Sequence, residues 1–328
     1  MKKPLFKYLF TAALTVIALA GCKKEKTEEV DTDTSAVEDN AFAENTSSDI
    51  VEIGSQATDG NSSLNGFRLG DADAVLSNCA TIIHNTALHI DSVIFNGNVC
   101  MDGRTRSGIL IFNYSASSFF PIHYRDPGFT CTVTSSNYHV EGNQVNIINK
   151  TITNITHNMV MAGYDPTTEN EKWHITADIS ITRPSGAVIS WQCDRTKELL
   201  NTSTVGFANF YNDFTNISGG SDTVPINWAN ARVGITGSAT GSRTFNSVTE
   251  SVSINITNQL IRDFGWCSDS GHHPFFQGEL DHTRTGRPTR HMNFGSNANG
   301  NINNDCDKWV LITFTVNGNP HQVIRALY

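Results

Sequence analysis

Residues 173–181 read WHITADISI, and every second side chain in them is apolar. The turn sequence Pro184, Ser185 and Gly186 follows, and then a second alternating run, AVISW, at residues 187–191. A period of two built from Ile, Val, Thr and aromatic residues is typical of a strand with one buried face, and Pro-Ser-Gly is typical of a turn. The stretch therefore predicts two antiparallel strands joined by a short connection.

The same pattern recurs from about residue 64 to the C-terminus. Further alternating runs occupy residues 107–114, 144–152, 251–256 and 309–316, and clusters of Asn, Gly, Asp and Ser separate them. No run is followed by a long amphipathic helical segment, which parallel strands need as a crossover. The sequence predicts an all-β protein with antiparallel meander or sandwich-like sheets.

One short N-terminal helix is expected ahead of the strands, within residues 39–63. Ile50 and Ile53 fall close to one helical face, and Asp39 or Asn40 has a side chain that suits an N-cap. Turn-forming residues then lead to the first strand.

A faint internal repeat indicates how the strands are grouped. Residues 154–160 (NITHNMV) are echoed by residues 255–261 (NITNQLI). The shared order of these and neighbouring motifs predicts two related β units, residues 64–205 and 206–328. Such units are compatible with one continuous sheet, because a single unit often cannot bury its apolar face alone.

The first 21 residues have the order of a bacterial lipoprotein signal. Lys2, Lys3 and Lys7 precede an apolar core at residues 9–20, and the sequence LAGC ends at Cys22. This motif resembles the lipobox, whose cysteine is acylated and becomes the first residue of the mature chain. We expect lipid on Cys22 to anchor the protein to the membrane.

Removal of the signal makes the chain more acidic. The 328 residues carry 23 Lys and Arg against 32 Asp and Glu, a net charge of −9, and the signal takes away three lysines and no acid, which leaves −12. Many of the acids lie in residues 22–38, a polar segment that reads as a flexible tether. This balance excludes a nucleic acid as the main partner, because phosphate binding needs clustered Lys and Arg.

Acidic residues just behind a lipidated cysteine resemble the surface-export signal of Bacteroidota lipoproteins. Lys23 and Lys24 precede the acids here, so the match is partial. The expected location is the outer membrane, on the cell surface or the periplasmic face.

Six cysteines remain after Cys22, an even number that predicts disulfides in an exported protein. They are Cys79, Cys100, Cys131, Cys193, Cys267 and Cys306. Pairing of nearest neighbours gives Cys79–Cys100 and Cys267–Cys306 and leaves Cys131–Cys193. The alternative is a zinc site, but the chain has no C-x-x-C and no tight Cys/His spacing.

Two arginines form the candidate binding residues. Arg104 and Arg106 lie two positions apart and share a face if this segment is a strand. They could form a cradle for a carboxylate or sulfate. The alternative is pairing with Asp126 or Glu141 across neighbouring strands.

Motifs for metal binding and catalysis are weak. The densest histidine group is His272, His273, His282 and His291, without a recognised ligand spacing. The Asn-rich residues 297–305 lack the carboxylates of an EF-hand loop and read as a hairpin tip. There is no G-x-S-x-G, no glycine-rich phosphate loop and no unpaired nucleophilic cysteine in the predicted pairing. We therefore expect no metal, no cofactor and no catalytic residue.

Several of these motifs occur together in an order that resembles an uncharacterised group of all-β lipoproteins from the Bacteroidota. They include CATI at residues 79–82, IFNG at 94–97 and DGRTRSGI at 102–109, behind the lipobox and the acidic tether. The similarity extends over most of the chain from about residue 38. It implies an exported, anchored, all-β protein, and it implies no activity.

The favoured function is a lipid-anchored, non-catalytic binding or structural module of the envelope, with a glycan or another envelope protein as its partner. The alternative is an envelope carbohydrate-active hydrolase, whose paired carboxylates have no fixed sequence spacing. A flat or aromatic-lined face would favour binding, so the tryptophans need inspection. They are Trp173, Trp191, Trp228, Trp266 and Trp309.

Overall fold

The structure is a computed structural model, and its secondary structure is one helix with thirteen strands in the part of the chain that it describes. The described residues are 35–59, 79–100, 102–117, 124, 128–156, 170–200, 231–263, 266–267 and 275–326. The helix is α2 (Ser35–Asp59). The strands are β1 (Ala80–Asn85), β2 (Ile90–Val99), β3 (Thr105–Asn113), β4 (Thr130–Val140), β5 (Asn143–Asn154), β6 (Glu171–Thr182), β7 (Val188–Leu199), β8 (Arg232–Phe245), β9 (Val248–Asp263), β10 (Gln277–Arg284), β11 (Arg290–Asn293), β12 (Trp309–Val316) and β13 (Asn319–Ala326).

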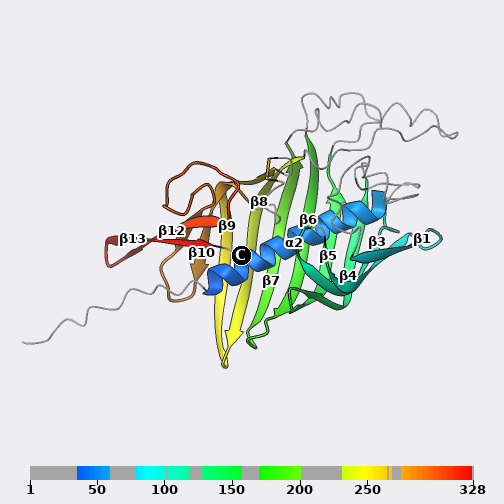
Figure 1. Ribbon diagram of the computed structural model, residues 1–328, viewed down its shortest axis with the longest axis horizontal. Helices are drawn as coiled ribbons and strands as arrows, with labels where there is room; N and C mark the ends of the chain where they lie inside the picture. The colour runs from blue at the N-terminus through cyan, green and yellow to red at the C-terminus, as the bar shows by residue number, and fades with distance from the viewer. Residues whose placement is uncertain are drawn as a thin grey trace, which may run out of the picture. The chain divides into compact units, whose positions relative to one another are not determined.

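All thirteen strands form one antiparallel sheet, and their order in the sheet is their order in the chain. Each strand from β2 to β12 pairs with the strand before it and the strand after it, and β1 and β13 are the two ends of the sheet (Figure 1). This meander confirms the all-β prediction. The sheet runs without interruption from β7 to β8, across the predicted boundary between the two units, so the described strands form one sheet and not a sandwich of two.

The alternation of apolar and polar residues in the sequence corresponds to one buried and one more exposed face of the sheet. In β6, Trp173, Ile175, Ala177 and Ile179 are buried, while the side chains that alternate with them are half-buried on the opposite face. The indole of Trp173 stacks on Tyr124 at 4.9 Å between ring centroids and donates a hydrogen bond to the Tyr124 carbonyl oxygen. The buried face of the sheet is therefore the core.

Helix α2 lies across this buried face (Figure 1). Its sequence is rich in Ser, Thr, Asn and Asp, which are poor helix formers, so packing and not propensity stabilises it. Ile50 and Ile53 are fully buried, and Gly54 lets the helix approach β3: a Cβ there would lie 2.7 Å from Phe112 Cε1.

The helix is longer than predicted and begins earlier. It starts at Ser35, inside the segment expected to be tether, so Asp39 and Asn40 are not N-caps. Both are buried and contact the sheet, which explains why the helix extends past them toward the N-terminus.

Candidate functional site

Acidic and polar side chains of helix α2 are bound mainly to basic residues of the sheet. The helix carries six acids and no Lys or Arg. We call the side chains that join it to the sheet the ionic interface. On the sheet they are Arg106, Lys150, Arg183, Trp191, Arg195, Lys197, Arg243 and Arg262.

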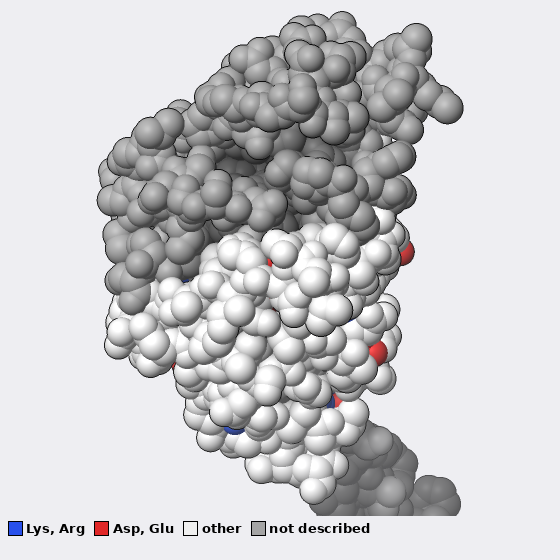
Figure 2. Space-filling model, turned by 90° about the vertical axis from the view of Figure 1, so that its right-hand side faces the viewer, with Lys and Arg blue, Asp and Glu red and all other residues white. Residues whose placement is uncertain are grey.

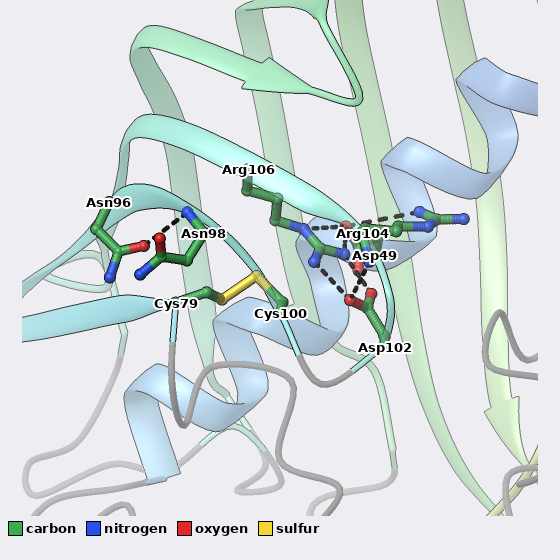
Figure 3. Close-up of a disulfide and its surroundings, with 8 residues drawn as sticks. All are labelled: Asp49, Cys79, Asn96, Asn98, Cys100, Asp102, Arg104 and Arg106. Atoms are coloured by element: carbon green, nitrogen blue, oxygen red, sulfur yellow. Dashed lines mark hydrogen bonds and ion pairs between the residues drawn. A yellow bond between two sulfur atoms is a disulfide. The ribbon is translucent and has the colours of Figure 1, made fainter.

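Arg106 of β3 contacts Asp49 in the C-terminal half of α2 (Figure 3). It is 0 % exposed, and its Nη2 lies 2.7 Å from Asp49 Oδ2 and 2.5 Å from Asp102 Oδ2. Arg104 Nη1 lies 3.8 Å from the same Asp49 oxygen. The two predicted binding residues therefore do hold a carboxylate together, but it belongs to α2 and not to a ligand.

Electrostatics keeps this cluster charged. Burial opposes the charge on Arg106, but Asp49 and Asp102 raise the pKa of its guanidinium above the usual range. Burial likewise favours a neutral Asp102, but Arg106 lowers the pKa of that carboxyl. The alternative partners weighed for the arginines were Asp126, which lies outside the described residues, and Glu141, for which no ion pair with either arginine is seen among the described side chains.

Strand β7 contributes two further pairs, along the axis of the helix. Arg195 Nη2 lies 2.6 Å from Glu44 Oε2, and Lys197 Nζ lies 2.5 Å from Glu52 Oε1. The side chains of Arg195 and Glu44 are 3 % and 6 % exposed. Removal of either partner of such a pair is strongly destabilising, because the remaining charge would be buried without water or a counter-charge.

The N-terminal half of α2 is fixed by Asp39. Its two carboxylate oxygens accept hydrogen bonds from Arg183, at 2.9 Å, and from Arg243, at 2.7 Å. One residue later, the Asn40 side-chain oxygen accepts a hydrogen bond from the buried Trp191 indole at 3.2 Å. These contacts join α2 to the sheet as far as β8, those of Asp49 reach β3, and Arg262 extends the ionic interface to β9.

Lys150 lies near the middle of the ionic interface, together with two cysteines. It is 1 % exposed, its Nζ donates to Ser47 Oγ at 2.8 Å, and burial lowers its pKa to about 8. Burial raises the pKa of the Cys193 thiol to about 11 and raises that of Cys131 further. Both thiols are therefore neutral near pH 7 and chemically quiet.

Two of the three predicted disulfides are confirmed. Cys79–Cys100 and Cys267–Cys306 are bonded, with Cα–Cα distances of 5.0 Å and 5.2 Å. These bonds also exclude a zinc site built from these four cysteines, since a disulfide sulfur is not a thiolate ligand.

The third predicted disulfide, Cys131–Cys193, is wrong, because both cysteines are free and buried. Cys131 is on β4 and Cys193 on β7, with β5 and β6 between them. Three strand spacings amount to about 14 Å, and a disulfide needs Cα atoms within about 7 Å. Nearest-neighbour pairing could not detect this, because it ignores how many strands separate two positions.

The two described histidines of the group, His282 and His291, do not converge. His282 is fully buried, and burial with Arg290 and Arg284 lowers its pKa to about 4. His291 is on the opposite face, with its Nδ1 2.8 Å from Asp281 Oδ1. His272 and His273 lie outside the described residues. Within the described ranges, no group of three His, Cys, Asp or Glu side chains could hold a metal ion.

Polar backbone contacts account for the Asn-rich hairpin tip. Asn297 Oδ1 accepts hydrogen bonds from the backbone N–H groups of Asn299 and Asn301, at 2.9 Å and 3.1 Å. The Asn297 side-chain oxygen thus has its hydrogen-bond partners within the turn, and no bound ion is needed to account for its position.

The tryptophans fall into two classes. Trp173 and Trp191 are core residues, at 0 % and 1 % exposed, whereas Trp266 is 56 % exposed. Three contacts hold Trp266 in place: its backbone N–H donates to Asp263 Oδ1, its ring meets Phe276 edge-on at 4.9 Å between centroids, and its neighbour Cys267 is in a disulfide. Trp309 is half-buried beside Lys308, and Trp228 lies outside the described residues.

Cys22 and the predicted signal and tether up to residue 34 also lie outside the described residues. Among the described residues no helix is both long and apolar enough to cross a membrane. The chain matches no protein-family model, no curated protein and no solved structure.

Sequence reasoning missed the ionic interface, although a signal for it exists. In β7, Arg195 and Lys197 continue the inward phase set by Ile189 and Trp191, so charged residues stand where apolar ones are expected. Inward charges on a strand call for an opposite charge above them, and the acidic helix is the element that supplies it.

Proposed function

We propose that this chain is a lipid-anchored envelope lipoprotein, as the resemblance to Bacteroidota lipoproteins implies, and that it acts as a non-catalytic binding or structural module. The observation that carries the proposal is the position of α2. It is the first described element behind the predicted tether, and buried charge pairs bind it to the sheet from β3 to β8.

This arrangement suits a body that is held by its N-terminus. A pull on a lipidated Cys22 passes through the tether to Ser35 and then along α2, where Asp39, Glu44 and Asp49 each hold a different part of the sheet. The force is thus shared among several ion pairs and does not act on a single edge strand.

Within this module we infer that Trp266 is a contact residue for a glycan. An exposed indole offers a flat apolar platform for the C–H face of a sugar ring, and Trp266 is already immobilised, so little entropy is lost on binding.

Cell fractionation tests the anchor. The wild-type chain should partition with membranes, and Cys22→Ala should appear in the soluble fraction or accumulate unprocessed. Normal processing with unchanged membrane partitioning of Cys22→Ala would contradict the anchor.

Binding assays test the module. Trp266→Ala should weaken retention on envelope polysaccharide by about tenfold, the scale of one hot-spot aromatic, while Ile148→Ala, an exposed apolar residue of central strand β5, should not. Hydrolysis of the polysaccharide by the wild-type chain would instead support the alternative, a carbohydrate-active hydrolase.

A further inference from the structure

We propose that the free edge of β1 pairs with the same edge of a second copy of this chain. Strand β1 is at one end of the sheet order and forms a ladder with β2 only, among the strands that the structure describes. Figure 1 shows it at the right-hand limit of the sheet. The proposal stands on the geometry of this edge and does not require the lipid anchor.

The unused hydrogen-bonding groups of β1 can be assigned from its ladder. The Asn96 N–H donates to the Cys79 carbonyl oxygen at 3.0 Å, so these two residues form a hydrogen-bonded pair. Such pairs alternate along an antiparallel ladder, and the β1–β2 register is unbroken. The peptide groups of Ala80, Ile82 and His84 therefore point away from β2, toward the free edge.

This edge lacks the usual protection against strand addition. Proteins blunt exposed edges with charges, Pro or bulges, and β1 (Ala80–Asn85) contains no Asp, Glu, Lys, Arg, Pro or Gly and no bulge. Strand β13 at the other end does carry such devices, Pro320 and Arg325. Figure 2 views the molecule from the β1 side, and its described surface there is almost entirely uncharged.

The edge is also held in a regular strand conformation. The Cys79–Cys100 disulfide fastens one end of the β1–β2 hairpin (Figure 3). At the other end, His84 Nδ1 lies 2.8 Å from the buried Asp91 carboxylate, its direct cross-strand partner. A strand fixed at both ends loses little conformational entropy when another strand adds to it.

Composition favours a second copy as the occupant. Like edges that carry no charge do not repel each other, and an antiparallel pair of β1 strands brings Thr81, Ile82 and Ile83 of the two copies together. Ile83 is 53 % exposed and Leu88, in the turn after β1, is 57 % exposed, so pairing covers apolar surface that water now contacts. A charged peptide would find no complement here.

Covalent trapping is the suitable readout, because two six-residue edges bury less area than a standard interface and exchange quickly. A photo-crosslinking amino acid replaces Ile83 in the full chain in expressing cells. The control carries it at Ile148, which is 59 % exposed on central strand β5 and has no free edge beside it. We expect a crosslinked band of twice the chain mass at position 83 and none at 148.

A second variant tests the hydrogen bonds. Ile82→Pro removes an N–H that faces the free edge and leaves the β1–β2 ladder intact, so it should weaken the doubled band by about tenfold or more. The Cys79–Cys100 bridge, mapped in the same sample, reports that the hairpin has formed. The proposal is overturned by the absence of a doubled band at position 83, by equal bands at 83 and 148, or by an adduct of another mass, which would show that a different protein occupies the edge.

Discussion

Lys150 is a buried amine within the ionic interface, and its pKa of about 8 lies below the 10.5 of an ordinary lysine because of burial. Between about pH 8 and pH 10.5, Lys150 binds a proton in the unfolded chain but not in the folded chain. The free energy of unfolding should therefore rise with pH across this window, by at most about 1.4 kcal/mol per pH unit.

Lys150→Met should abolish this slope, and below pH 8 it should be more stable than the wild type because it buries no ammonium group. Denaturant titrations of both proteins from pH 7 to above pH 10 measure the difference, in which groups common to both cancel. Parallel stability curves for the two proteins would show that Lys150 titrates normally.

Gly54 is the residue at which α2 comes closest to β3. A Cβ there would lie 2.7 Å from the Phe112 ring, so Gly54→Ala should cost about 1–3 kcal/mol even though Ala is the better helix former. Gly54→Ala combined with Phe112→Leu should recover part of the loss, because the smaller side chain makes room. Urea denaturation compares the three proteins, and a Gly54→Ala variant that gains stability would contradict the close contact.

At the scale of elements, the helix and the sheet depend on each other through buried charges. Glu44→Met or Arg195→Met alone should destabilise the protein by about 3–5 kcal/mol, since each leaves its partner buried and unpaired. The double replacement should cost much less than the sum of the single ones. A double-mutant cycle by denaturant unfolding gives the coupling energy.

The outer face offers a matched control for this cycle. His174 and Asp194 lie 2.9 Å apart on neighbouring strands β6 and β7, with side chains 43 % and 71 % exposed. Their replacement by Ala should change stability by about 0.5 kcal/mol or less, as is usual for exposed pairs. Equal coupling at both sites would mean that burial does not strengthen the Glu44–Arg195 pair.

How far the sequence predicts these elements depends on the range of the information each one needs. Strand β6 follows from its own period of two, and the Cys79–Cys100 bridge from two cysteines close in the chain. The start of α2 does not follow from local sequence. Asp39 resembles an N-cap, and only its contacts with Arg183 and Arg243 explain why it is buried. Local patterns cannot reveal partners that lie on the far side of the fold.

At the scale of the whole molecule, the arrangement of strands decides which cysteines can react. After alkylation under denaturing, non-reducing conditions, mass mapping should find label on Cys131 and Cys193 and intact Cys79–Cys100 and Cys267–Cys306 bridges. In the native protein the two free thiols should resist the same reagent, because they are 1 % and 8 % exposed. A Cys131–Cys193 bridge would require a different strand order.

The meander was predictable as a class, whereas one continuous sheet was compatible with the sequence but not required by it. Turn residues and alternation identify hairpins, and each hairpin is a local event. Whether successive hairpins share one sheet depends on pairs such as β7 with β8, which residues 201–230 separate in the chain. The relation between the two predicted units remains a prediction from the repeat.

The order of strands and the position of α2 together determine the order in which parts of the protein can fold. Each strand of the meander needs only its predecessor, so the sheet can grow hairpin by hairpin as the chain leaves the ribosome or a translocation channel. The helix is made first, yet its contacts with Arg243 and Arg262 span 204 and 217 residues. Asp39 and Asn45 must wait for Arg243 and Arg262, so the docking of α2 is completed only after most of the sheet has been made.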